Sequence, residues 1–363
     1  MKHHMSTKQL FVIAFILLSF SSCRTGSNQE NARKAVTKQI SGTEMTVCNL
    51  EGYGIVGLNG NYLFLKENRD TSRLVVYHIE GDSLTRFKGL INKGRGPREF
   101  NYPEYAFTRD SLFISNSDPG GMRAIYGISL RDMRNIDNVQ AWSEYTFHET
   151  DLMTGLSFVP LGAGKFVLAA GTAGTRQIFS LADFGKGERI PLLFWPNDST
   201  AGPLHCKQMV YMQSKLRARG EKILYANLNA RYLFIGTIRD NQLSVNSVIY
   251  SHLPQYQVKA DENIRYLEDG EYGILPYTTE KFIYAQVGRT VREVKQSDSY
   301  KGYPVLYCDE IEVYDWDGTF IDNYQTDRPF YSFAVTPDNK TLYTMSQDTL
   351  SKEPVIVRYA LAH

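Results

Sequence analysis

The sequence contains few cysteines and no paired cysteine motif. Four cysteines are spread over 363 residues, and no two of them form a CxxC pair. This spacing does not describe a disulfide framework and excludes a zinc knuckle. The chain also lacks a P-loop, a GxSxG nucleophile elbow and two histidines at zinc-binding spacing. The common sequence signatures of phosphate-binding, serine-nucleophile and zinc enzymes are therefore missing.

A strong charge of either sign is absent as well. The formal net charge is +1, which argues against nucleic acid as a partner, because nucleic-acid binding requires a basic stripe. One uncharged run, residues 10–20, follows a Lys-bearing start. It has the length of a signal-peptide core and is too short to span a bilayer as a helix. We expect residues 1–22 to be a signal peptide that is removed from the mature protein.

The end of this signal resembles a bacterial lipobox. Small residues, Ser21 and Ser22, precede Cys23, whose thiol would receive the lipid. The alternative is an ordinary secretory signal that leaves Cys23 as a plain thiol. Residues 23–35 are polar and predict a lipidated N-terminus followed by a flexible tether. Since acidic residues do not crowd the position after Cys23, we expect a lipid anchor in the cell envelope that faces the periplasm rather than the cell surface.

A two-part hydrophobic pattern recurs along the chain. Each repeat has a short apolar run, a turn, and a second apolar run that contains an aromatic residue. These aromatics are about 45 to 55 residues apart, except for one interval of about 80 that holds an insertion; this period is typical of propeller blades. The first runs begin at Leu63, Leu112, Phe166, Ile223, Phe282 and Leu342, and the aromatics are Tyr77, Tyr126, Phe179, Phe234, Tyr314 and Tyr359.

The expected fold is all-β: a six-bladed β-propeller with four-stranded antiparallel blades. The two apolar runs of each repeat predict the middle strands of a blade. Outer strands are expected at residues 84–87 and 320–324. Innermost strands are expected at residues 105–107, 156–158 and 330–333.

The last blade lacks an outermost strand of its own. Only residues 360–363 follow Tyr359, too few for a turn and a strand. An open blade would leave unpaired backbone groups at a sheet edge. Residues 36–48 are therefore expected to supply an N-terminal strand that closes the ring, with a loop as the alternative. Residues 36–363 form one predicted domain.

Two motifs resemble the TolB-like six-bladed β-propeller lipoproteins of Gram-negative bacteria, which are related to NHL repeats. The first is the Gly-rich stretch at residues 93–100, and the second is the stretch at residues 311–318. The likeness extends over residues 40–361. Arg98 departs from it, because Gly is commoner there in the family motif. The resemblance implies the fold and an envelope location but no particular chemistry.

The Gly-rich stretch is the first candidate ligand-binding segment. Arg95 and Arg98 offer forked donors to a carboxylate or phosphate, and Glu99 lies beside them. The structural alternative is that the glycines only turn the chain, Glu99 pairs with a nearby Arg, and Phe100 packs between blades. Four arginines recur a few residues before the aromatics of successive repeats, which indicates a structural role: Arg73, Arg123, Arg176 and Arg231.

The insertion in the fifth repeat is the second candidate segment. It occupies residues 287–310 and should emerge on the same face as the Gly-rich stretch. A solvated flap without a partner is the alternative. The candidate ligand-binding residues of this insertion are Arg289, Arg292, Tyr300 and Tyr303.

The sequence favours a binding or scaffolding module that holds a peptide, glycan or protein partner. No catalytic residue, metal ligand or cofactor is predicted; Asp315 and Asp317 lack the later acidic ligands of a calcium loop and fit a hairpin turn instead. The alternative is a metal-dependent hydrolase or lyase with its site in the propeller channel. The lipid anchor implies the membrane as a further partner.

Overall fold

The computed structural model describes residues 37–67, 72–94, 96, 98–116, 124–147, 152–153, 157–172, 174–267, 273–289, 307–348 and 350–362. The predicted signal peptide, Cys23 and the predicted tether lie outside these residues. In the described part of the chain, none of the helices combines the length and the hydrophobicity needed to cross a bilayer.

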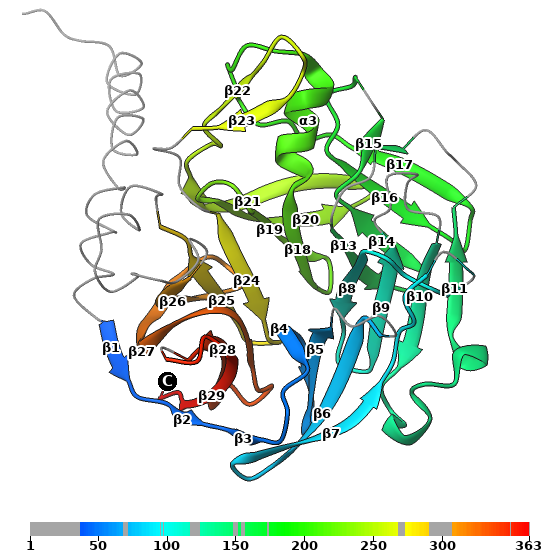
Figure 1. Cartoon of the computed structure of the whole chain (residues 1–363). Helices are drawn as coiled ribbons and strands as arrows, with labels where there is room; N and C mark the ends of the chain where they lie inside the picture. Colours follow the sequence, from blue (N-terminus) through cyan, green and yellow to red (C-terminus); the bar gives the residue numbers. More distant parts are fainter. Residues whose placement is uncertain are drawn as a thin grey trace, which may run out of the picture.

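Small antiparallel sheets surround a common centre, the arrangement of a β-propeller (Figure 1). The first sheet has β4 (Gly52–Asn59), β5 (Tyr62–Glu67), β6 (Leu74–Glu80) and β7 (Ser83–Gly89). The second has β8 (Pro103–Phe107), β9 (Ser111–Asn116), β10 (Ala124–Ser129) and β11 (Ser143–Thr146). The third has β13 (Phe158–Gly162), β14 (Lys165–Leu168), β16 (Phe179–Asp183) and β17 (Glu188–Leu192). The fourth has β18 (Ser214–Arg219), β19 (Lys222–Asn227), β20 (Tyr232–Arg239) and β21 (Gln242–Ser251).

The rest of the ring is one eight-stranded sheet. Its strands are β24 (Ile274–Thr278), β25 (Phe282–Val287), β26 (Cys308–Asp315), β27 (Phe320–Val335), β28 (Thr341–Gln347) and β29 (Pro354–Ala360), with the short β1 and β2. Shorter elements connect the sheets: β12 (Leu152–Met153), β15 (Gly171–Thr172), β22 (Tyr256–Val258), β23 (Ile264–Tyr266), two 3-10 turns (Met133–Asn135 and Val139–Ala141) and helix α3 (Leu204–Met212).

Strand β27 joins two four-stranded units of the eight-stranded sheet. Its first half pairs with β26 and its second half with β28, with register shifts near Phe330. The sequence predicted two separate strands, at 320–324 and 330–333. They form one strand because no glycine or turn motif interrupts the chain between them. Pro329, which lacks an N–H, lies next to the irregularity, where a missing ladder bond is tolerated.

The repeated hydrophobic pattern corresponds to the second and third strands of each unit. Every predicted first run lies in β5, β9, β14, β19, β25 or β28, and every aromatic lies in the strand that follows and pairs with it. The innermost strand predicted at 156–158 instead begins at Phe158. Strand alternation sends these side chains between adjacent sheets.

Aromatic rings fill the space between neighbouring sheets. Phe64 packs edge-on against Phe107 at 5.3 Å between ring centroids, which joins the first and second sheets. Phe179 and Tyr225 make the same type of contact, also at 5.3 Å, between the third and fourth sheets. Each such pair contributes about 0.5–1.5 kcal/mol beyond its buried area. The core is therefore a series of inter-sheet layers around the ring.

The N-terminal segment of the described chain contacts three strands. Strand β1 (Thr37–Ile40) pairs parallel with β27, and β2 (Thr43–Glu44) pairs antiparallel with β29. Strand β3 (Thr46–Val47) pairs parallel with β7 of the first sheet. The segment thus makes backbone pairs with the eight-stranded sheet and with the first sheet.

Candidate functional site

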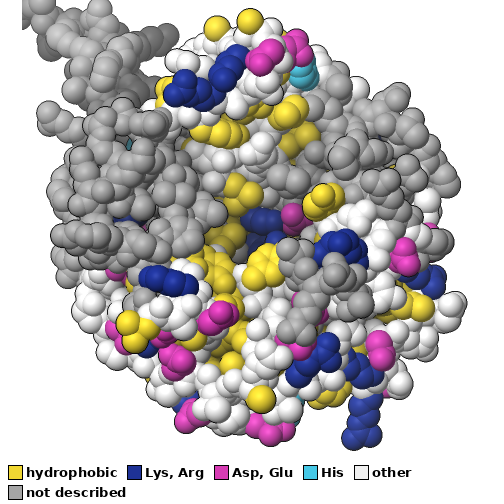
Figure 2. All heavy atoms as spheres, viewed as in Figure 1, with side chains coloured by type: hydrophobic (Ala, Val, Ile, Leu, Met, Phe, Trp, Pro, Cys, Tyr) yellow, Lys and Arg dark blue, Asp and Glu magenta, His cyan; other side chains and the backbone are white. Residues whose placement is uncertain are grey.

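The innermost strands of the units run in one direction and enclose a channel. These strands are β4, β8, β13, β18, β24 and the second half of β27. The face on which they begin is termed the start face, and the face on which they end is the end face. The start face carries two cavities, and in Figure 2 basic and hydrophobic side chains lie in a hollow at the centre of the molecule.

The first cavity, the channel cavity, has a volume of about 320 Å³ and lies between the first halves of the innermost strands. Its cations are Lys66, Lys215 and Arg217, and among the described lining residues its one carboxylate is Glu104. Residues of β18 alternate: Leu216 is fully buried in the inter-sheet core, while its neighbours Lys215 and Arg217 line the cavity. The alternation of side chains along this one strand therefore places two cations in the channel.

An ion pair spans the channel. The Nζ atom of Lys215 on β18 lies 2.7 Å from Oε2 of Glu104 on β8, and the two side chains are 18% and 17% exposed. The pair links the fourth sheet to the second, which are not consecutive in the ring. Removing one partner of such a largely buried pair leaves an uncompensated charge and is strongly destabilising.

The other two cations have little compensation. Among the described residues, the Lys66 ammonium has no hydrogen-bond partner, and Arg217 donates from Nη1 to its neighbour's carbonyl, Leu216 O, at 2.9 Å. Burial lowers the pKa of Lys66, the charge of Lys215 lowers it further, and Glu104 opposes both. Burial also lowers the pKa of Arg217, opposed by Tyr277 and Glu104. Three cations against one carboxylate leave the cavity with a formal charge of +2.

Tyrosine rings form much of the remaining wall. Tyr53, Tyr105, Tyr277 and Tyr331 line the channel cavity. Burial raises the pKa of Tyr277 to about 12 against the opposing effect of Arg217. Burial also raises the pKa of Tyr105 well above its usual value. These hydroxyls stay protonated at neutral pH and act as donors beside the cations.

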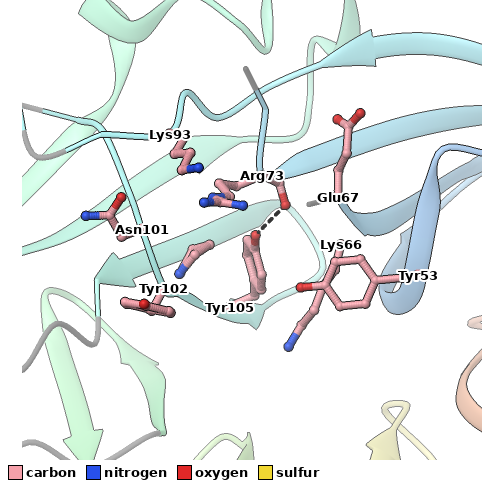
Figure 3. A pocket seen from close by; sticks show the side chains of 9 residues that line it. Tyr53, Lys66, Glu67, Arg73, Lys93, Asn101, Tyr102 and Tyr105 are labelled. Atoms are coloured by element: carbon pink, nitrogen blue, oxygen red, sulfur yellow. Dashed lines mark hydrogen bonds between the residues drawn. The ribbon is translucent and has the colours of Figure 1, made fainter. Parts of the chain in front are cut away.

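The second cavity, the lateral cavity, has a volume of about 620 Å³ and lies where the first two sheets meet. Arg73, Lys93 and Lys66 line it, with Glu67 as its carboxylate among the described lining residues. Figure 3 shows the Glu67 carboxylate turned away from Arg73 and Lys93. The Tyr105 hydroxyl donates to Arg73 O at 3.0 Å, the dashed line in Figure 3, and ties β8 to the residue directly before β6.

The Gly-rich stretch lies beside the lateral cavity. Its first residue, Lys93, and Tyr102, which follows the stretch, line the cavity, whereas neither Arg98 nor Glu99 does. Glu99 accepts a hydrogen bond from Gly96 N at 2.9 Å, and Arg98 Nη2 lies 3.7 Å from Glu144. Phe100 is buried and meets Tyr126 edge-on, which agrees with the structural alternative for this residue.

Arg98 has a φ of 62°, in the left-handed region that glycine favours. Arg98 therefore occupies a conformation that a side chain makes less favourable.

The candidate residues of the insertion are mostly outside the described part of the chain. Arg289 is described, and its Nη2 lies 2.9 Å from Oδ1 of Asp309 in β26. Arg95, Arg292, Tyr300 and Tyr303 lie outside the described residues, as does Cys23.

Sequence reasoning missed the channel residues. Lys66, Glu104, Lys215 and Arg217 were not predicted as site residues, and Arg73 was assigned a structural role. The sequence does mark some of these positions. Lys66 follows the apolar residues of a predicted strand, and Lys215 and Arg217 flank the apolar Leu216, and a charged residue in such a place is rarely buried without a partner. Arg231 does fit a structural role, because it donates from Nε and Nη2 to Gly288 O at 3.1 and 3.0 Å and joins two sheets.

A metal centre is not apparent in the described part of the chain, where no three His, Cys, Asp or Glu side chains gather closely enough to hold an ion. Of the three cysteines described, Cys206 and Cys308 are buried and Cys48 is exposed, and all three are free thiols.

No protein-family model and no curated protein matches this chain. Among solved structures, the β-propeller domain of Cps50 (Swd1) from Myceliophteria thermophila is similar, with 10% identity and a TM-score of 0.40 over 87% of this chain and 98% of that one. U3-55K is 9% identical, with a TM-score of 0.45 over 88% of this chain and 98% of its own. An auxiliary nutrient binding protein from Bacteroides thetaiotaomicron is 12% identical, with a TM-score of 0.42 over 84% and 67% of the respective chains. The fold is assigned from the sheets themselves.

Proposed function

We propose that this chain is a binding module of the bacterial cell envelope whose peptide, glycan or protein ligand carries an acidic group that enters the start-face mouth of the channel. The formal charge of +2 in the channel cavity carries this proposal. A carboxylate, sulfate or phosphate placed there would neutralise Lys66 and Arg217.

Burial makes this attraction effective. Charges in a partly dry cavity interact more strongly than on an open surface, and a polar group without a partner there is costly. The two cavity volumes, about 320 and 620 Å³, lie within the range of small-ligand sites, roughly 300–1,000 Å³. The tyrosine walls add contact area and hydroxyl donors.

Lipid attachment and ring closure are part of the same proposal. A signal peptide at 1–22, a lipidated Cys23 and a tether to residue 35 would hold the propeller at the membrane, facing the periplasm. The domain from residue 36 onward is proposed as a TolB-like ring of six blades that the pairings of β1, β2 and β3 close. Closing the ring in this way would remove an exposed sheet edge.

The enzyme alternative is less favoured on electrostatic grounds. A hydrolase or lyase with a divalent ion in the channel requires converging carboxylates, whereas Lys66, Lys215 and Arg217 would repel such an ion. A binding site for an anion agrees with the charges that are present.

Replacing Arg217 by Gln tests the binding function. The mature chain would be titrated by calorimetry with galacturonate and with the neutral sugar galactose. Binding of galacturonate alone, weakened at least about tenfold in Arg217→Gln, is expected, since a hydrogen bond to a charged group contributes about 1.5–3 kcal/mol. Arg219→Gln is the matched control, because Arg219 lies on the same strand at the end face. Equal effects of both variants would contradict the proposal.

Lipid attachment has its own test. Cys23→Ala should leave a folded protein and move it from the membrane to the soluble fraction, because a lipid chain on this thiol is the proposed anchor. Fractionation followed by immunoblotting measures this. Membrane association that persists in the variant would contradict lipid anchoring through Cys23.

A further inference from the structure

The channel cavity and the lateral cavity adjoin each other at shared lining residues. Tyr53, Lys66 and Tyr105 line both of them. Each cavity has three cations and one carboxylate among its described lining residues, and Lys66 is the cation common to both. Each cavity is therefore equipped for an anion.

We infer that the two cavities form one two-part site for a ligand with two acidic groups, joined by an uncharged segment that passes Tyr53 and Tyr105. This inference rests on the proposed binding function and names the chemistry of its ligand. One acidic group lies in the channel cavity near Arg217, and the other lies in the lateral cavity near Arg73 and Lys93.

The lateral part offers a firm recognition surface. Arg73 is only 8% exposed, and its backbone carbonyl accepts the Tyr105 hydroxyl, so its position is tied to β8. In Figure 3 the Lys93 and Arg73 side chains lie close together, opposite Asn101 and Tyr102. A guanidinium presents a planar fork of donors that suits a carboxylate, and an amide adds a donor and an acceptor for neutral groups.

The boundary between the two parts is aromatic. Tyr53 is 50% exposed at the mouth, and the Tyr105 hydroxyl is already engaged by Arg73 O. In Figure 3 the Lys66 ammonium points away from Arg73 and Lys93, toward the side where Tyr53 lies. The middle of the ligand thus passes two tyrosine rings, with the Lys66 ammonium on the Tyr53 side. A sugar ring or a short hydrocarbon chain has the matching chemistry.

Two acidic groups on one molecule should bind cooperatively. Once the first group is bound, the second binds intramolecularly, at an effective concentration in the range of about millimolar. A diacid of suitable length should therefore bind at least about tenfold more tightly than the matched monoacid. The gain should vanish when Arg217 in the channel cavity or Lys93 in the lateral cavity loses its charge.

Calorimetry on the mature chain tests the inference with two matched pairs of probes. Digalacturonate against galacturonate provides the saccharide pair, and pimelate against hexanoate provides the hydrocarbon pair. We expect a diacid advantage of at least about tenfold in one pair. That advantage should fall to about twofold or less in Arg217→Gln and also in Lys93→Gln, while Arg219→Gln keeps it. The pair that shows the advantage identifies whether the ligand middle is a sugar or a hydrocarbon.

Distinct outcomes separate the inference from the function beneath it. Equal binding of diacid and monoacid in both pairs, or a diacid advantage that Lys93→Gln leaves unchanged, overturns the two-part site. If the monoacids still bind and Arg217→Gln weakens them, the anion-binding function stands without the second part. If none of the four acids binds, the two-part site and the anion-binding function are both contradicted. Matching thermal melting curves for the three variants exclude a folding defect as the cause.

Discussion

The start face and the end face differ in charge although the same innermost strands run between them. At the start face the described residues that line the two cavities include five cations and two carboxylates: Lys66, Arg73, Lys93, Lys215 and Arg217 against Glu67 and Glu104. At the end face the described residues that line a cavity of about 670 Å³ include two of each, Arg109 and Arg219 against Asp110 and Glu280. A chain with a net charge of +1 thus concentrates positive charge at one mouth. The net charge of the whole chain therefore does not indicate the electrostatic potential at one face.

The ion pair across the channel gives the largest expected difference between the two mouths. Glu104→Gln should lower the free energy of unfolding by about 2–4 kcal/mol, because Lys215 would stay largely buried without its partner, beside Lys66 and Arg217. Glu280→Gln at the end face should cost at most about 0.5 kcal/mol, since its 4.0 Å contact with Arg219 is exposed. Urea denaturation measures both values.

A second substitution checks the cause of that effect. Adding Lys215→Met to Glu104→Gln removes the unpaired ammonium and should recover part of the lost stability. If the start-face and end-face variants lost equal stability, or if the double variant recovered none, the ion pair would not distinguish the two faces.

Raising the pH should weaken the start-face site through Lys66. Its pKa is lowered by burial, so the folded protein loses this proton below the usual lysine value of 10.5. Acid binding should therefore weaken, by about tenfold or more, as pH rises from that lowered pKa toward 10.5, because one charged hydrogen bond is lost. The comparison is galacturonate affinity against pH in the wild type and in Lys66→Met, whose profile should be flatter.

The same titration has the opposite effect on stability. Between the lowered pKa and 10.5 the unfolded lysine binds more protons than the folded one. Its contribution to the free energy of unfolding therefore increases with pH in this window. The difference in stability between wild type and Lys66→Met should follow that sign, and a difference that does not change with pH would mean that Lys66 is not held in a cationic, buried setting.

The smallest effect is expected at Arg98, beside the lateral cavity but outside it. Arg98→Gly should raise the free energy of unfolding by up to about 1 kcal/mol, because glycine adopts a φ of 62° without strain. Acid affinity should stay within about twofold of the wild type, since Arg98 does not line either cavity. Lys93→Gln is the contrasting variant on the same stretch. A large loss of affinity in Arg98→Gly would extend the site into the Gly-rich stretch.

The repeat could be predicted from the sequence because it depends on local patterns. Short apolar runs with an aromatic partner mark the middle strands, and their spacing marks one sheet after another. The channel residues could not be predicted in this way. Glu104 and Lys215 are 111 positions apart and meet only because the ring brings β8 and β18 to a common channel. The continuity of β27 likewise depends on pairing with two neighbouring strands, β26 and β28, in addition to the lack of a turn motif in its own sequence.

Locating a bound anion tests the central claim most directly. Crystals of the mature chain would be soaked in selenate at a concentration that saturates binding in solution, and anomalous scattering would place the selenium. The account predicts a peak in the channel cavity within hydrogen-bond distance of the Arg217 guanidinium and the Lys66 ammonium. A peak only in the end-face cavity, or no peak in the channel at saturation, would contradict it.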